Sequence, residues 1–511
     1  MSHIDKLGIN VFNGSYPELI RVKPKTLESV SNWFEIRILF NPITLTWLRY
    51  IFLNVIRQQR TAIESMDELT RKNLLSETRN QLMRQGFKTN LVGNLFVLLE
   101  QIWQSHWKEN LSANAAWAAF LMLKGCAVEV RRTEKEQAML LCACTAALID
   151  IPVHWIVSDE RSAITLVEKN AIFFQALDME SPLADREKPA IKKQVMIVTA
   201  ERLARDYLWD KQTLGRSQGH LRLLLHKLGG DISSFSQLQK KGLCFALIEN
   251  IDFWLMEKAF ATVEMDNGEQ QITLHELFSR HLRCAGNLLS PQSLNKALWN
   301  RYKVVPIALS DYQKGNKYFG VSFFKNLDQK WEVIAKKLVE INQANEKACL
   351  IVTTSESLDN LHHIDGKPPI VKEIRGKITN QFHTNNLLVL AEPFPWLGLE
   401  EWLNDTNCRL IIVDFCDSLR LLHHLERMCS SAIPIEMIFS LEDNWLQKID
   451  IPSIHYWLRQ LLRWRETVNG KMGSWLLKWL LSKVETKRKR LNSEMNRWLW
   501  QKERMFSFFK K

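Results

Sequence analysis

The sequence predicts an α/β protein with two parallel-sheet lobes, preceded and followed by helical regions. Apolar segments of strand length alternate with helical segments, which is typical of βαβ units. This alternation occurs twice along 511 residues, a length sufficient for several domains with separate cores. Apolar residues then recur at helical spacing to the end of the chain. We therefore divide the chain into residues 1–86, 87–300, 301–443 and 444–511.

The first region, residues 1–86, is expected to be helical. Ser65 followed by Glu68 fits a capping box, and Gly86 would end the helix that follows it. The first residues lack the basic start and apolar core of a secretory signal. The most apolar early stretch, residues 33–56, is interrupted by charges and predicts amphipathic helices rather than a membrane span.

Strand-like segments define the two lobes. In the first lobe they are residues 127–131, 151–157, 195–199 and 243–248. Residues 272–289 are expected to form one amphipathic helix. In the second lobe the predicted strands are residues 349–354, 387–391 and 409–415, after a helix over 331–343.

The positive charge is concentrated in the last region. The net charge is +12, and residues 456–511 carry 15 Lys and Arg against 4 Asp and Glu. Six of the 19 tryptophans lie in the same segment. A long helix of this kind can pack on the lobes, lie on anionic lipid, or bind nucleic acid through phosphates and base stacking. The apolar stripe favours packing, with membrane or partner contact as an addition.

Metal chemistry has little support in the sequence. The nine cysteines are scattered, and Cys142 with Cys144 is a poor zinc pair without a second one. We expect buried, reduced thiols and no metal site. Adjacent histidines do not face one site, so the thirteen histidines are interpreted as surface or core residues.

The apolar run 243–248 ends in the sequence Glu249-Asn250-Ile251-Asp252. A buried strand followed by acidic residues is how many nucleotide-driven motors hold Mg²⁺, because hard oxygen ligands must sit at the carboxyl end of a strand. The layout fits such a strand, but one carboxylate position holds an amide.

Several short motifs follow one another over about residues 75–508, among them FKTNLVGN at residues 87–94 and ALIENIDFWLMEKA at residues 246–259. In this order they resemble the motor core of SecA, the bacterial preprotein translocase ATPase, whose corresponding motifs read F-D-V-Q-L-I-G-G and A-I-V-D-E-V-D-S-I-L-I-D-E-A. Residues 330–332 (KWE), 440–443 (SLED) and 483–485 (KVE) match further family motifs. The resemblance implies two RecA-like lobes of the P-loop NTPase and helicase type, with a C-terminal scaffold helix.

The resemblance fails at the catalytic positions. The family's T-G-E-G-K-T is expected at about residues 106–112 (HWKENLS), which contain no glycine to bring backbone N–H groups onto phosphates. Its arginine fingers fall on residues 424–430, where only Arg427 matches. Asn250 replaces the carboxylate that would polarise the attacking water. A vestigial nucleotide site would comprise Phe87, Asn90, His106, Lys108, Asn110, Glu249 and Arg427, with Glu249, Asn250 and Asp252 as the degenerate catalytic positions.

The client-binding part is also reduced. The family inserts its preprotein-crosslinking domain where this chain has only residues 266–271. The leading hypothesis is a SecA-like pseudo-ATPase, not an enzyme and without a bound cofactor, that acts as a scaffold or accessory subunit in protein secretion. The alternatives are a divergent but active translocation ATPase and a helicase-derived nucleic-acid-binding protein, although nucleic acid is the less favoured partner.

The expected partners are proteins of a translocation assembly and an anionic membrane surface. The expected location is the cytoplasm, with peripheral attachment at the inner face of the plasma membrane. The candidate contact residues in the tail are Trp475, Trp479, Lys487, Arg488, Lys489, Arg490, Trp498 and Trp500.

Overall fold

The computed structural model divides the chain into two compact units, residues 1–310 with 497–511, and residues 311–496. It describes residues 17–19, 41–108, 110–179, 195–214, 242–265, 271–288, 295–309, 319–344, 348–352, 355–364, 370–374, 387–390, 409–413, 435–443, 446, 456, 458, 460, 467–468, 472–473, 475–484, 486, 490, 494 and 497. The four-region division stays a prediction.

Four described helices precede the central sheet of the first unit: α2 (Pro42–Glu64), α3 (Glu68–Gln85), α4 (Thr89–Trp107) and α5 (Ala113–Leu123). The side chain of Asn41 caps α2 by accepting from the Ile43 N–H. The predicted capping box is wrong, because Ser65 is the C-cap of α2 and Asp67 is the N-cap of α3. Gly86 ends α3 with a positive φ of 73°, as its position predicts.

A six-stranded parallel sheet forms the centre of the first unit, in the order β3-β2-β4-β7-β1-β8. Its strands are β1 (Cys126–Glu129), β2 (Val153–Val157), β3 (Val195–Thr199), β4 (Phe245–Ile248), β7 (Arg283–Leu288) and β8 (Val305–Ile307). The connecting helices are α6 (Arg132–Leu148), α7 (Glu160–Ala176), α8 (Ala200–Leu214), α11 (Leu274–Ser279) and α12 (Asn295–Tyr302).

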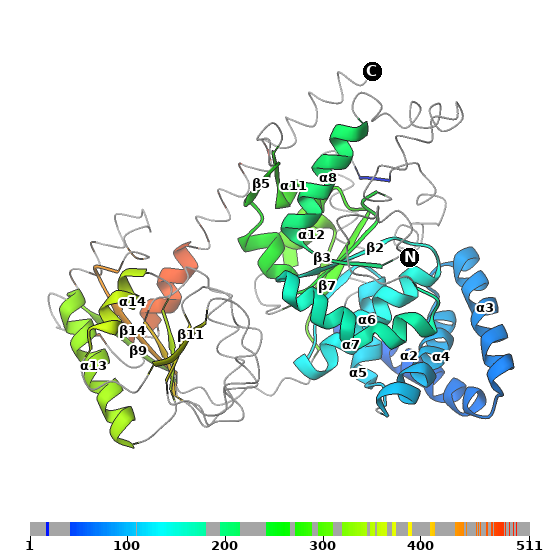
Figure 1. The fold of residues 1–511 in the computed structure, drawn as a ribbon, viewed down its shortest axis with the longest axis horizontal. Helices are drawn as coiled ribbons and strands as arrows, with labels where there is room; N and C mark the ends of the chain where they lie inside the picture. Colours follow the sequence, from blue (N-terminus) through cyan, green and yellow to red (C-terminus); the bar gives the residue numbers. More distant parts are fainter. Residues whose placement is uncertain are drawn as a thin grey trace. The chain divides into compact units, whose positions relative to one another are not determined.

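The sheet separates two hydrophobic cores. In Figure 1, α5, α6 and α7 lie on one side of it, and α8, α11 and α12 lie on the other. The side chains of β4 alternate accordingly: Phe245 and Leu247 belong to the first core, and Ala246 and Ile248 to the second. Because both faces are covered, β4 is apolar along its whole length, as its sequence predicts.

The predicted single helix over residues 272–289 is wrong. Gln271–Thr273 form β6, which pairs with β5 (Thr262–Glu264) in a two-stranded antiparallel sheet, and α11 ends at Ser279 before β7 begins. In β7 a Cβ on Gly286 would lie 1.9 Å from the carbonyl oxygen of Ile248 on β4. The backbones of β7 and β4 approach so closely here that only glycine fits at position 286. Gly286 therefore belongs to the pairing of two strands and not to a helix.

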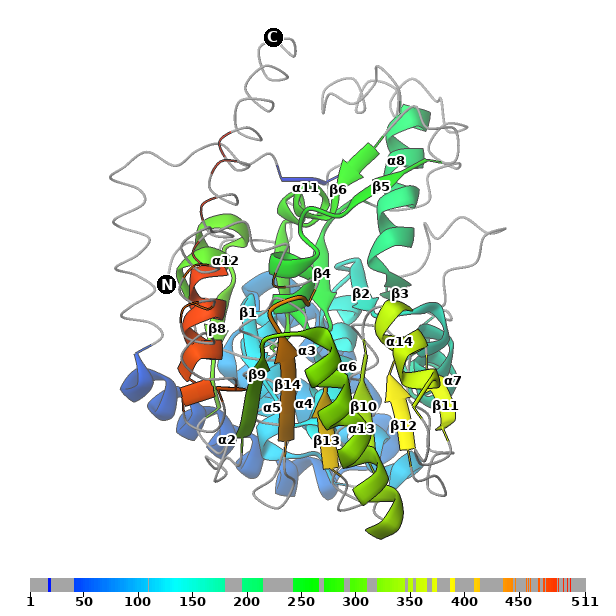
Figure 2. The same ribbon diagram turned by 90° about the vertical axis from the view of Figure 1, so that its left-hand side faces the viewer.

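The second unit has a seven-stranded sheet in the order β11-β12-β10-β13-β14-β9-β15. Its strands are β9 (Phe319–Phe324), β10 (Ala348–Ile351), β11 (Ile370–Ile374), β12 (Leu387–Leu390), β13 (Arg409–Ile412), β14 (Ile435–Ser440) and β15 (Thr467–Val468). All of them pair in parallel except β15, which is antiparallel to β9. Figure 2 shows α13 (Leu327–Ala344) and α14 (Ser355–His362) lying across one face of this sheet.

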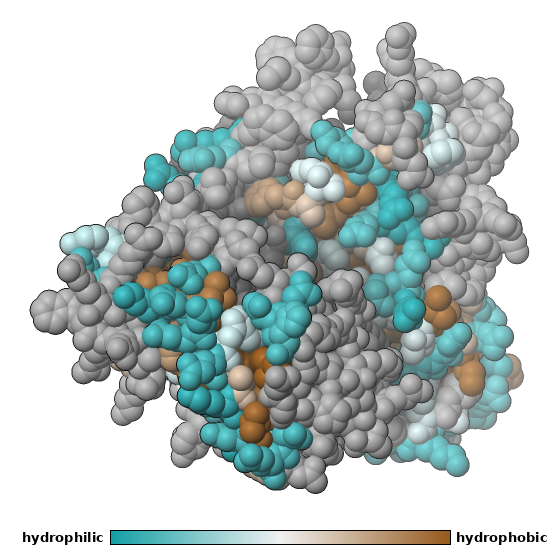
Figure 3. Space-filling model, turned by 60° about the vertical axis from the view of Figure 1, so that its left-hand side comes forward, coloured by the Kyte–Doolittle hydropathy of each residue, from teal (hydrophilic) through white to brown (hydrophobic). Residues whose placement is uncertain are grey.

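A buried ion pair joins the first helix of this unit to the end of β14. The Lys330 ammonium lies 2.5 Å from Asp443 Oδ1, and Asp443 Oδ2 accepts from the Ser440 N–H at 2.8 Å. The motifs KWE and SLED, more than a hundred residues apart in sequence, are therefore in contact through their Lys and Asp. Hydrophilic residues make up most of the described surface visible in Figure 3.

The predicted fold class is confirmed: two α/β units, each with a parallel sheet of RecA-like type, with additional helices. The six described cysteines are buried, and burial raises the pKa of the Cys126 thiol to about 12. Among the described residues no helix is both long and apolar enough to cross a membrane. The same residues contain no cluster of three or more His, Cys, Asp or Glu suited to a metal ion.

Candidate functional site

The carboxyl ends of β4, β7 and β1 meet at the centre of the first sheet. In the strand order, β2 lies on one side of β1 and β8 lies on the other. The chain runs from β1 to β2 in one direction along the sheet, and later from β7 to β8 in the opposite direction. Such a reversal opens a crevice at the carboxyl edge, which is where open α/β sheets bind ligands. The residues that follow β1 and β4 are therefore the candidate site of this unit.

An ion pair occupies this edge. The Lys135 ammonium lies 3.0 Å from Glu249 Oε2, and their side chains are 16% and 7% exposed. Lys135 is the fourth residue of α6, directly after β1, and Glu249 directly follows β4. The Glu249 N–H donates to the Ile156 carbonyl at 2.9 Å, which fixes the backbone beside β2. The pair thus links the ends of β1 and β4. A nucleotide phosphate and its metal ion would have to fit between these two side chains.

The connection from β1 to α6 is too short to surround a phosphate. Only Val130 and Arg131 lie between Glu129, the last residue of β1, and Arg132, the first of α6. A P-loop has the form G-x-x-x-x-G-K-[ST] between strand and helix, so that several backbone N–H groups converge on the phosphates. Residues 130–137 (VRRTEKEQ) contain no glycine. This strand–turn–helix unit has the P-loop position but lacks its phosphate cradle.

The amide of Asn250 is used for structure. Its backbone N–H donates to Asn287 Oδ1 at 3.0 Å, and Asn287 Nδ2 donates to Asn250 Oδ1 at 3.0 Å. Asn250 adopts a left-handed backbone with φ of 52°, a conformation that asparagine tolerates better than most residues. Both side chains are buried. This reciprocal pair ties the end of β4 to β7 and leaves no carboxylate at position 250.

Residues 106–112, where the resemblance to SecA places the family's phosphate loop, join two helices. The helix α4 ends at Trp107, Lys108 takes a left-handed C-cap with φ of 54°, and α5 begins at Ala113. That placement of the P-loop is therefore wrong in its structural context, because no strand precedes the segment. Buried Glu100 holds it, since Glu100 Oε1 accepts from the Leu111 N–H at 3.2 Å.

The same segment nevertheless lies beside the beginning of α6. Ser112 Oγ donates to Glu134 Oε1 at 2.5 Å, and Asn114 Nδ2 donates to the same oxygen at 3.3 Å. The predicted residues Lys108 and Asn110 do not make these contacts: Lys108 is exposed, and Asn110 Oδ1 accepts from Gln104 Nε2.

The remaining predicted site residues have mixed positions. Phe87 packs partly buried against the first core, Asn90 is exposed, and Asp252 is buried after Asn250. The His106 side chain and Arg427 lie outside the described residues. Membership of all these residues in a vestigial nucleotide site stays a prediction.

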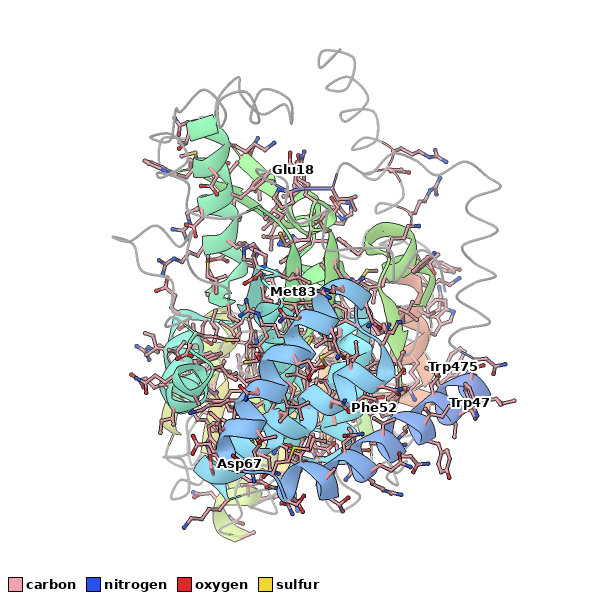
Figure 4. All side chains as sticks on the ribbon, turned by 90° about the vertical axis from the view of Figure 1, so that its right-hand side faces the viewer. Glu18, Trp47, Phe52, Asp67, Met83 and Trp475 are labelled. Carbon is pink, nitrogen blue, oxygen red and sulfur yellow. The ribbon has the colours of Figure 1, made fainter. Side chains whose placement is uncertain are left out.

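In the tail, residues 475–484 are helical with two different faces. Leu476 and Leu480, which belong to the predicted apolar stripe, are buried, and so are Leu477 and Leu481. On the exposed side, Trp475, labelled in Figure 4, is 61% exposed. Its ring stacks on that of Trp479, with ring centroids 6.5 Å apart. The Lys483 ammonium lies 5.9 Å from the Trp479 ring. Arg490 is described and exposed, whereas Lys487, Arg488, Lys489, Trp498 and Trp500 lie outside the described residues.

Two residues of the site were not identified from the sequence. Lys135 closely follows the predicted strand 127–131, where the lysine of a P-loop would be expected, but the segment contains no glycine that would indicate a phosphate loop. Asn287 lies in the segment predicted as a helix, where its alignment with the end of β4 could not be recognised.

Comparisons with known proteins give one relative in sequence and distant structural neighbours. No protein-family model matches the chain. A segment of 157 residues is 30% identical to protein translocase subunit SecA 2 of Bordetella avium (strain 197N). The aligned part covers 28% of this chain and 22% of that protein, so the match spans about a fifth of the relative.

Two solved structures of helicases are among the neighbours. The crystal structure of the DUF1998 helicase MrfA bound to DNA has a TM-score of 0.41 and 9% identity, over 71% of this chain and 50% of that chain. The crystal structure of a hypothetical ATP-dependent RNA helicase from Sulfolobus tokodaii has a TM-score of 0.27 and 14% identity, over 68% of this chain and 98% of that chain. The fold assignment rests on the two sheets described above.

Proposed function

We propose that this chain is a SecA-like pseudo-ATPase that serves as a scaffold or accessory subunit in protein translocation. The observation that carries the proposal is the carboxyl edge of the first sheet. There Lys135 is paired with Glu249 across the site, and the β1–α6 connection offers no glycine cradle. The matching segment of SecA 2 supports the translocation context.

The ion pair opposes nucleotide binding. Mg-ATP needs Lys135 on its phosphates and Glu249 near the metal, so both charges would have to leave a mostly buried contact of 3.0 Å. Binding would therefore gain only the difference between these new contacts and the ion pair that they replace. The β1–α6 connection has no glycine-rich backbone to add further contacts to the phosphates.

Catalysis has a further obstacle at position 250. ATP hydrolysis requires a group that orients and polarises the attacking water. The amide of Asn250 cannot accept a proton, and its oxygen already accepts from Asn287. The first unit is therefore suited to a structural role, with translocation proteins as partners and an anionic membrane as an additional contact of the tail.

A second candidate function is supported by the stacked tryptophans of the tail. Trp475 and Trp479 are i, i+4 neighbours, and Lys478 and Lys483 lie on the same short helix. Aromatic rings beside cations are the usual means of binding single-stranded nucleic acid. Substituting both tryptophans with alanine in the full chain should abolish a salt-dependent shift of single-stranded oligonucleotides, if this function is the correct one.

Nucleotide binding and turnover test the leading proposal. Full-length protein is titrated with Mg-ATP in a calorimeter, and phosphate release is measured for the unchanged chain, Glu249→Gln and Glu136→Gln. Glu136 lies on α6 but contacts Lys169 and Asn170 instead of the site, so its variant is the matched control. We expect no binding heat up to millimolar nucleotide and the same background phosphate release for all three proteins.

The partner role needs its own measurement. Affinity capture from the native cell is carried out with the full chain and with a variant truncated before residue 456. The capture should recover translocation components.

Turnover that disappears in Glu249→Gln but persists in Glu136→Gln would instead establish the divergent active ATPase.

A further inference from the structure

Three residues near the N-terminus are bound at the opposite end of β4 from the candidate site. The Pro17 carbonyl accepts from the Leu243 N–H at 2.8 Å, and the Leu19 N–H donates to the Arg280 carbonyl at 2.7 Å. Leu243 precedes β4 and Arg280 precedes β7. Pro17–Leu19 therefore bind by backbone hydrogen bonds to two segments at the amino edge of the first sheet.

The side chain between these two hydrogen bonds is a buried carboxylate. Glu18 Oε2 accepts from the Tyr207 hydroxyl at 2.8 Å, and Glu18 Oε1 accepts from Lys211 Nζ at 3.3 Å. Arg280 Nη1 lies 3.7 Å from Glu18 Oε2, and the side chain of Glu18 is 13% exposed. Figure 4 labels Glu18 on its short segment. Three groups from α8 and the end of α11 thus surround one carboxylate.

The charges of the pocket are matched to an anion. Arg280 also donates to Glu276 Oε1 at 2.8 Å, so two carboxylates, Glu276 and Glu18, face the two cations. Burial raises the pKa of the Glu18 carboxyl, but Lys211, Arg280 and the hydrogen bonds lower it by more, and the net pKa is below its usual range. Without the Glu18 carboxylate, Lys211 and Arg280 would each lose an anionic partner in a largely buried pocket, which is costly.

The surface under the peptide is also shaped for close backbone approach. Gly242 has a φ of +100°, and a Cβ at this position would lie 2.5 Å from Pro17 Cδ and 2.7 Å from the Pro17 carbonyl oxygen. Any larger residue would collide with the bound segment. Backbone hydrogen bonds together with a pocket for one side chain are the features of extended-peptide recognition.

We propose that this pocket is a binding site for a short acidic peptide segment of the type Pro-Glu-Leu, which the chain's own N-terminal segment occupies in cis. Recognition comes from the backbone partners at Leu243 and Arg280 and from the carboxylate pocket of Tyr207, Lys211 and Arg280. The peptide pocket beside Gly242 and the candidate site at Glu249 lie at opposite ends of β4. The proposed peptide site therefore does not depend on the proposed function. An acidic segment supplied in trans can bind only when the cis segment leaves.

Peptide binding to the full-length chain tests this proposal. Glu18→Arg places a third positive charge in the pocket and should displace the cis segment. A fluorescent peptide with the sequence of residues 13–23 (NGSYPELIRVK) is then titrated against the unchanged chain, Glu18→Arg and the matched control Glu64→Arg, whose charge lies on the exposed end of α2. We expect saturable binding to Glu18→Arg alone, and at least about tenfold weaker binding of the peptide with Gln in place of Glu.

Absence of peptide binding to a folded Glu18→Arg variant, or equal binding of the Glu and Gln peptides, would overturn the proposal. Hydrogen exchange of Glu18→Gln gives a second measurement that does not require complete release. In the unchanged chain the amides of Leu19 and Leu243 should exchange slowly. In Glu18→Gln both should exchange at least about tenfold faster, and unchanged protection would contradict the role of the carboxylate.

Discussion

Replacing Lys330 with methionine should destabilise the second unit strongly. The Lys330 side chain is 0% exposed and Asp443 is 3% exposed, with 2.5 Å between Nζ and Oδ1. Methionine retains most of the aliphatic volume but leaves the Asp443 carboxylate buried without its cation. Removing one partner of a buried ion pair costs about 3–5 kcal/mol. The loss is a large fraction of the roughly 5–15 kcal/mol that stabilises a typical domain.

The magnitude can be expressed as a thermal shift. For a folding unit of this size, 1 kcal/mol changes Tm by about 2–4 °C, so Lys330→Met should lower the Tm of the second unit by roughly 6–20 °C. Calorimetry of the full chain should show the transition of the second unit moving while that of the first unit stays. Lys336→Met is the matched control, because its ion pair with Glu332 on the same helix is exposed and should leave Tm unchanged.

A double variant identifies the cause. Lys330→Met with Asp443→Leu removes both charges, and part of the lost stability should return. The recovery should be incomplete, because Asp443 also accepts from the Ser440 N–H. If Lys330→Met melts like the unchanged chain, the ion pair does not hold α13 against the end of β14, and this reasoning is refuted.

Three further predictions concern the first unit. Gly286→Ala places a Cβ 1.9 Å from the Ile248 carbonyl oxygen, so this variant should fail to give soluble, cooperatively melting protein, and normal melting would contradict the β4–β7 packing. Asn250→Ala breaks the reciprocal amide pair with Asn287, and chemical denaturation should show a loss of about 1–3 kcal/mol. The pKa of Glu18 is lowered on folding, so its stabilising effect is present above its unfolded-state pKa near 4.5 and is lost as pH falls through the folded value. The difference in Tm between the unchanged chain and Glu18→Gln should therefore be full at pH 7 and shrink on acidification below about pH 4.5, and a pH-independent difference would exclude this linkage.

The strands were predictable where burial on both faces makes a continuous apolar run. β2, β4, β10 and β13 are of this kind, because their side chains are almost all buried on both faces of the strand. β7 was missed because Arg283–Leu288 contains Gly286 and Asn287 among its apolar residues and follows a helix after only three residues. Its strand character comes from its neighbours β4 and β1, and a local pattern cannot contain that information.

The candidate site was predictable only in part, for a similar reason. Glu249 and Asn250 were identified because they directly follow an apolar strand. Lys135 becomes recognisable only when the sheet order places β1 beside β7 and one strand from β4. The partnership of Glu18 with Tyr207 and Lys211 spans almost two hundred residues, and no sequence spacing indicates such a contact.

We propose that the carboxyl edge of the first sheet keeps a RecA-like fold without ATPase chemistry. Calorimetric titration of the full-length chain with Mg-ATP, followed by phosphate release under the same conditions, tests it most directly. We expect no binding heat up to millimolar nucleotide and no turnover above background, because the β1–α6 connection has no glycine cradle and Lys135 is paired with Glu249 at 3.0 Å. Saturable binding with turnover that Glu249→Gln abolishes would contradict it.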